Sequence, residues 1–155
     1  AIVLGPMIAG AILLVVQTSL LIVIALLMGL EPATGLPGLL AVLGFAMLLG
    51  VAFSGFTVGV ALRTGNAGAT QGASFLFFPL SFLTATFVPL NLLTGWIKTA
   101  ATYNPITYIL EATRSIINVG WESETILRGL GAIALMAVVL FLWAFASLRS
   151  RTARK

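Results

Sequence analysis

The sequence contains no cysteine and no histidine, and very few of its residues carry a charge. The absence of cysteine excludes disulfides and thiolate metal sites. The absence of histidine removes the commonest general base, metal ligand and physiological-pH switch. Charged residues make up 8% of the 155 residues, whereas they make up about a quarter of a typical soluble domain. With 60% hydrophobic residues and a mean hydropathy of +1.15, the chain needs lipid as its solvent.

Signatures of nucleotide binding and catalysis are also missing from the sequence. No GxxxxGK[ST] phosphate loop is present, so the chain cannot bind ATP in the P-loop manner. Glu122 and Glu124 are two apart in an expected solvated turn and do not form a catalytic carboxylate pair. Between residues 31 and 111 the only charges are Arg63 and Lys98, which argues against a proton-coupled carrier. We therefore expect neither enzymatic activity nor a directly bound cofactor or metal.

Four apolar stretches have the length of membrane-spanning helices, which need about 20 apolar residues each. They cover residues 7–30, 36–62, 67–89 and 126–148. Pro79 interrupts the third stretch, and we expect a kink between Phe75 and Pro79 because proline removes a backbone hydrogen bond that neighbouring helices must replace. The prediction is an all-α, polytopic membrane helix bundle with four transmembrane helices, forming a single domain over residues 1–155.

The segment 90–120, between the third and fourth stretches, is too long for a turn and too apolar for a solvated loop. Asn104 followed by Pro105 is typical of a helix start, and a stop signal begins at Asn118. Apolar positions between them recur at helical spacing, at Ile106, Ile109, Leu110, Thr113, Ile116 and Ile117. The residues expected to lie largely away from this stripe are Glu111, Arg114 and Ser115. Together with a shorter helix around Trp96, which suits the headgroup level, the segment is predicted to form two short re-entrant or amphipathic helices.

Basic residues predict the orientation of the chain. Four of the eight Lys and Arg residues lie in the tail, residues 149–155, and Arg63 lies in the second connection. The first connection, residues 31–38, contains no basic residue. Since cytoplasmic loops carry an excess of Lys and Arg, we expect the tail and the second connection to face the cytoplasm of a multi-pass cell-membrane protein. The segment 90–120 is then extracytoplasmic.

Polar residues inside the expected spans allow two interpretations. The favoured one is hydrogen bonding between helices, and the alternative is that some of them line a substrate path. The candidates for either role are Ser54, Thr57, Gln71, Ser81 and Thr84. Gly55 and Gly59 form a small-xxx-small pair, which favours close helix packing over a hinge.

An ordered set of short motifs runs through residues 87–114. They are Phe87-Val88-Pro89, Gly95-Trp96, Asn104-Pro105-Ile106-Thr107 and Glu111-Ala112-Thr113-Arg114. This set resembles the type-2 ABC exporter permeases, in particular their daunorubicin-resistance-like branch. Thr94 stands where that family often has proline. The resemblance covers residues 55–155, and the first span matches by hydropathy alone.

The resemblance implies a permease subunit of an ATP-driven exporter, forming part of the path for a drug, lipid or other amphipathic substrate. Such permeases have six membrane helices, pair as dimers and sit on cytoplasmic ATP-binding cassette subunits, which hold the ATP. The chain would then be helices three to six of a longer protein in the lipid bilayer, with no nucleic-acid partner. A non-transporting membrane scaffold or assembly subunit is the alternative, and a secondary carrier comes third.

Overall fold

The structure is a computed structural model that describes residues 4–75, 79, 84 and 90–152. Helices make up the secondary structure of these residues, and none of them forms a strand. The elements in chain order are α1 (Leu4–Leu27), α2 (Gly35–Thr64), α3 (Ala67–Ser74), the 3₁₀ turn η1 (Leu90–Leu92), α5 (Gly95–Tyr103), α6 (Pro105–Asn118) and α7 (Ser123–Thr152). The all-α prediction is therefore confirmed.

Three of the described helices, α1, α2 and α7, are long and apolar enough to cross a membrane. At 1.5 Å per residue, the 30 residues of α2 and of α7 extend about 45 Å, which exceeds the roughly 30 Å of a bilayer's hydrocarbon. These helices confirm the first, second and fourth predicted spans. Helix α7 continues to Thr152, so the first basic residues of the tail belong to the helix.

The first span ends through local backbone chemistry. Gly29 adopts a positive φ of 93°, which a residue with a side chain rarely takes. The backbone N–H of Leu30 then donates to the carbonyl of Ala25 at 2.9 Å, and this bond closes the helix end. Pro32 follows two residues later and cannot continue the helix.

The predicted third span is described only at its start. Helix α3 covers eight residues, and the Asn66 side chain caps it by accepting from the N–H of Gly68 at 2.8 Å. Most of residues 75–89 lie outside the described residues, including the greater part of the expected kink between Phe75 and Pro79. The third predicted span, residues 67–89, therefore stays a prediction.

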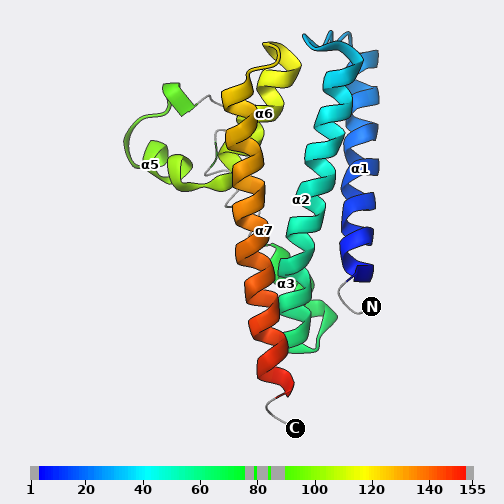
Figure 1. Cartoon of the computed structure of the whole chain (residues 1–155), viewed down its shortest axis with the longest axis vertical. Helices are drawn as coiled ribbons and strands as arrows, with labels where there is room; N and C mark the ends of the chain where they lie inside the picture. Colours follow the sequence, from blue (N-terminus) through cyan, green and yellow to red (C-terminus); the bar gives the residue numbers. More distant parts are fainter. Residues whose placement is uncertain (1–3, 76–78, 80–83, 85–89, 153–155) are drawn as a thin grey trace.

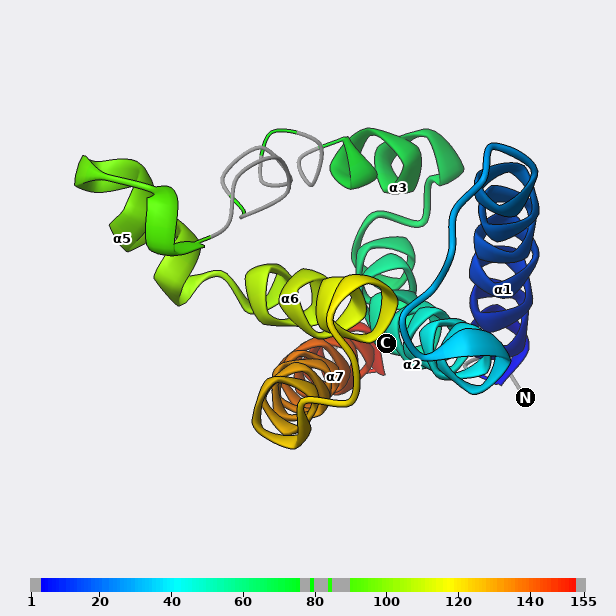
Figure 2. The same ribbon diagram turned by 90° about the horizontal axis from the view of Figure 1, so that it is seen from above.

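Helix α2 lies at the centre of the helix bundle. It packs against α7 on one side and α1 on the other, and α6 lies across one end of the α2–α7 pair (Figures 1 and 2). Buried side chains of α2, α6 and α7 form the core: Val42, Phe45, Ala52, Ile109, Ala112, Ile116, Ala132, Ile133 and Met136. Helix α5 stands apart from the long helices in both views.

Glycines set the distance between these helices. A Cβ placed on Gly55 would lie 3.3 Å from the backbone of Leu140, and Gly59 lies directly under the Trp143 ring. The prediction that Gly55 and Gly59 permit close packing is confirmed. At the crossing of α1 and α2, a Cβ on Gly50 would lie 2.5 Å from the Gly10 carbonyl oxygen.

The buried face of α6 differs from the predicted stripe. Ser115, expected to lie away from it, is buried, so that expectation was wrong. Ala112 is fully buried and meets Gly129 of α7, where a Cβ would lie 2.6 Å from that of Ala112. Ile109 and Ile116 of the predicted stripe are buried in the core, but the stripe omitted Ala112, the small residue that lets α6 approach α7 closely. Ser115 is accommodated because its hydroxyl donates to the Gly120 carbonyl at 3.2 Å.

The connections gather at two ends of the bundle. The N–H of Ala33, between α1 and α2, donates to the carbonyl of Ile117 at the end of α6. At the other end, Arg63 near the end of α2 bonds to Ser147 of α7. The start of α1 lies at this second end too (Figure 1). This is the pairing of connections that the predicted topology requires.

Candidate functional site

Asn104 joins the two short helices. Its backbone N–H donates to the carbonyl of Ala101 at 3.2 Å and so closes α5. Its side-chain oxygen accepts from the N–H of Ile106 at 3.0 Å and so caps α6. Pro105 occupies the first helical position, where its missing N–H costs nothing. The Asn-Pro part of the motif is explained by this double cap.

The Gly95-Trp96 pair forms the start of α5. Gly95 has a φ of +64°, a conformation that favours glycine. Trp96 is 70% exposed and Lys98 is also exposed. An exposed tryptophan beside a lysine suits a membrane–water boundary, as the sequence analysis expected.

Thr107, the last residue of the Asn-Pro-Ile-Thr motif, is fully buried at the start of α6. Its hydroxyl oxygen makes no hydrogen bond within the part of the chain that the structure describes. A buried hydroxyl without a partner is destabilising.

Glu111 and Arg114 line one cavity of about 430 Å³ between η1, α6 and the start of α7. The other lining residues are Asn91, Ser115, Val119, Glu122 and Thr125. Glu122 accepts hydrogen bonds from the hydroxyls of Ser115 (3.3 Å) and Thr125 (3.0 Å). The structure thus brings Glu111 and Arg114 together with residues of neighbouring elements. That they fasten the segment to an adjacent helix stays a prediction.

Four of the five candidate path or packing residues belong to the described part of the chain, and they differ in exposure. Ser54 is buried and its hydroxyl donates to the carbonyl of Val51, while Thr57 donates to the carbonyl of Ser54. Both bonds lie within α2, so these hydroxyls are satisfied without another helix. Gln71 is exposed on α3, and Thr84 is buried.

Three candidate residues, Ser81, Phe87 and Pro89, lie outside the described residues.

A cluster at the far end of the bundle was missed by the sequence analysis. The Arg63 Nε–H donates to the Ser147 hydroxyl at 2.9 Å, and its guanidinium carbon lies 5.2 Å from the centroid of the Trp143 ring. Phe56 stacks on the same ring at 5.6 Å between centroids. Trp143 and Ser147 are four apart in α7 and so share a face. Nothing local in the sequence indicates which residue of α2 faces them.

Comparison with known proteins identifies the family of the chain. Residues 1–118, about three quarters of the chain, match the ABC-2 type transporter family. The chain belongs to that family. The match ends at the last residue of α6. Within this ABC-2 family member, α7 lies beyond the match but packs along both α2 and α6.

Curated relatives of this ABC-2 family chain include the probable doxorubicin resistance ABC transporter permease protein DrrC from two strains of Mycobacterium tuberculosis, CDC 1551 / Oshkosh and ATCC 25618 / H37Rv. Each is 27% identical over 106 residues, which is 68% of this chain and 38% of the relative. The chain therefore aligns with well under half of the length of these relatives. No solved structure matches the chain significantly.

Proposed function

We propose that this ABC-2 family chain is part of the membrane-spanning permease of an ATP-driven exporter that moves drugs or other amphipathic molecules. The observation that carries the proposal is the family match over residues 1–118. The relatives named as probable doxorubicin resistance permeases support drugs as the class of substrate. In this proposal the chain is not an enzyme and binds no cofactor, and ATP is hydrolysed on a partner ATP-binding cassette subunit.

Helix α2 gives the proposal a mechanical basis. It extends about 45 Å, and its glycines hold it tightly against α7. One end of α2 carries the Arg63–Ser147 bond, and the other end is preceded by the loop that bonds to α6. If nucleotide binding by a partner subunit favours one arrangement of the bundle, both ends of the rigid α2–α7 pair would move together.

The proposal includes an orientation and an assembly. The end of the bundle with Arg63 and the basic tail faces the cytoplasm and the ATP-binding subunit, and the end with α6 faces outward. A second permease copy completes the path, as the resemblance to the type-2 ABC exporter permeases implies. Residues of α1 that point away from α2 then contact lipid or further helices, since no residue of the α1 spanning window is fully buried.

The experiment uses the full-length protein expressed with its ATP-binding subunit in inside-out membrane vesicles. We expect ATP-dependent accumulation of doxorubicin, followed by its fluorescence. Vesicles carrying an ATP-binding subunit that binds but cannot hydrolyse ATP are the matched control and should not accumulate the drug. Accumulation driven by a proton gradient without ATP would contradict the proposal and favour a secondary carrier. The absence of any drug accumulation in assembled complexes would favour a scaffold.

A further inference from the structure

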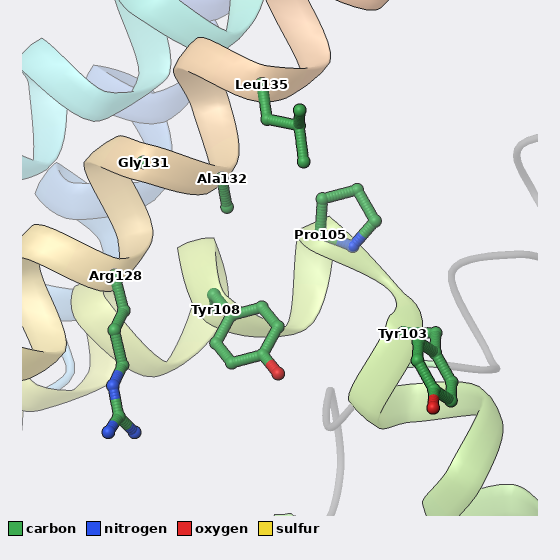
Figure 3. A pocket seen from close by; sticks show the side chains of 7 residues that line it. All are labelled: Tyr103, Pro105, Tyr108, Arg128, Gly131, Ala132 and Leu135. Atoms are coloured by element: carbon green, nitrogen blue, oxygen red, sulfur yellow. The ribbon is translucent and has the colours of Figure 1, made fainter.

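A second cavity, of about 400 Å³, lies between the α5–α6 junction and the outward half of α7 (Figure 3). Three of its lining residues come from the junction and four from α7. They are Tyr103, Pro105, Tyr108, Arg128, Gly131, Ala132 and Leu135. None of them has a role in the proposed transport cycle. The cavity is separate from the one lined by Glu111 and Arg114.

The lining of this cavity changes from polar to apolar along α7. Arg128 lies five residues after the start of the helix at Ser123. Gly131 and Leu135 follow one and two turns further on, so Leu135 lies about 10 Å deeper along the helix axis. The cavity therefore has a cationic mouth near the helix end and an apolar wall at membrane depth.

The apolar part of the cavity is open toward the surroundings of the helix. A Cβ placed on Gly131 would meet nothing within 4 Å among the described residues. Leu135 is exposed although it belongs to a spanning helix. At this depth the surrounding solvent is hydrocarbon, so the notch at Gly131 suits an acyl chain.

The polar mouth offers donors suited to a phosphate. The Arg128 side chain is 63% exposed, and its Nη2 contacts Glu124 at 2.5 Å. A guanidinium carries five N–H donors in a planar fork, so this contact uses one part of the fork and leaves another for a phosphate oxygen. An exposed ion pair of this kind is weak, so Arg128 can bind a phosphate while it contacts Glu124.

Two tyrosines border the mouth. The Tyr108 hydroxyl donates to the carbonyl of Thr102 at 2.8 Å, which fixes the ring and leaves the phenol oxygen able to accept. Tyr103 is 84% exposed. Tyrosine rings with an apolar body and a polar tip are typical of the headgroup level of a bilayer.

We infer that this cavity binds one phospholipid of the surrounding bilayer, with its phosphate on Arg128 and an acyl chain over Gly131 toward Leu135. A free anion would bind at the polar mouth but would not contact the apolar wall. A purely apolar molecule would leave the guanidinium without a partner in the cavity. Only a molecule with both parts in this order matches the lining.

The test uses the full-length protein in detergent, with phosphatidylglycerol added and bound lipid counted by native mass spectrometry. R128Q should weaken binding about tenfold, the effect of losing one charge-assisted contact. K98Q removes the same charge from an exposed position on α5 outside the cavity and is the matched control. It should bind lipid like the unsubstituted protein.

A second pair of variants tests the apolar part without changing charge. G131L fills the notch and should also weaken lipid binding, whereas A134L adds the same side chain at an exposed position outside the cavity and should not. Equal losses within either pair would overturn the inference, as would displacement of the lipid by inorganic phosphate. Stoichiometric displacement by doxorubicin would assign the cavity to the transported drug and overturn it too.

Discussion

At the scale of single residues, the crossing of α1 and α2 depends on two glycines. Gly10 and Gly50 bring the two backbones together, because a Cβ on Gly50 would lie 2.5 Å from the Gly10 carbonyl oxygen and 2.9 Å from the Cα of Ala11. These are backbone atoms, which cannot turn aside as a flexible side chain can. Close backbone approach of this kind is the usual basis of helix association in membranes.

Gly50→Ala should therefore push α1 away from α2. We expect a loss of about 1–3 kcal/mol in stability, the range for overpacked contacts, seen as a lower melting temperature of the full-length protein in detergent. Gly44→Ala is the matched control, since a Cβ there meets nothing within 4 Å in the described part of the chain. Equal melting temperatures for the two variants would contradict the close crossing.

The Trp143 ring is the second residue-scale feature. It lies on Gly59, stacks on Phe56 and faces the Arg63 guanidinium. Trp143→Leu removes the stack and the cation–π contact and leaves a void over Gly59. A loss on the order of 2 kcal/mol is expected, measured as thermal unfolding in the same detergent. Trp121→Leu, at an exposed position before α7, is the control and should have little effect on stability. A comparable loss of stability in this control would show that the contacts around Trp143 contribute no stability of their own.

At the scale of elements, the loop between α1 and α2 closes the end of α6. The Thr34 hydroxyl donates to the carbonyl of Ile116 at 2.7 Å, and the Ala33 N–H donates to that of Ile117 at 2.7 Å. The last carbonyls of a helix have no partner within it. The loop supplies two such partners, so α6 and the α1–α2 connection are expected to move as one unit.

Thr34→Val keeps the shape of the side chain but removes the donor to Ile116. We expect a loss of about 1–2 kcal/mol and faster hydrogen exchange at the amides of the last turn of α6, followed by mass spectrometry. Thr34→Ser retains the hydroxyl and should keep both properties close to those of the unsubstituted protein. Unchanged exchange in the valine variant would mean that the loop does not hold α6.

The elements themselves were largely predictable because their signals are local. The start of α6 follows from the chemistry of Asn104 and Pro105, and its end at Asn118 agrees with the predicted stop. The long helices follow from length and hydropathy alone. Contacts between distant residues were not predictable: Thr34 and Ile116 are 82 positions apart, and no periodicity indicates their meeting.

The candidate site was less predictable for the same reason. Gly59 was found because a repeat of small residues is visible in one helix, whereas Gly10 and Gly50 meet across two helices. Ser115 was misplaced because polarity suggested exposure, although the Gly120 carbonyl accepts its hydroxyl's hydrogen bond. The cavity at Arg128 required the fold, since its lining comes from α7 and from the α5–α6 junction.

At the scale of the whole molecule, the bundle has two chemically distinct ends. One holds Arg63 and the basic continuation of α7, and the other holds the α1–α2 loop against α6. Each segment of the chain that runs from one end of the bundle to the other must cross the membrane an odd number of times. The fold requires Glu31 and Asn118 to share one side of the membrane, whatever the orientation, because Ala33 is bonded to Ile117.

Single cysteines can test this arrangement, because the chain itself contains no cysteine. Cysteines at Glu31 and Asn118, both exposed, should react in intact cells with a membrane-impermeant maleimide, and one at Ser150 should react only after permeabilisation. The physical reason for this expectation is the excess of basic residues at the tail, since segments on the cytoplasmic side carry an excess of Lys and Arg. Full labelling of each variant after denaturation is the control. If Ser150 labels in intact cells while the other two do not, the orientation is reversed but the fold stands. If Glu31 and Asn118 label from opposite sides, the contact between the α1–α2 loop and α6 is wrong, and with it the mechanical link on which the proposed coupling depends.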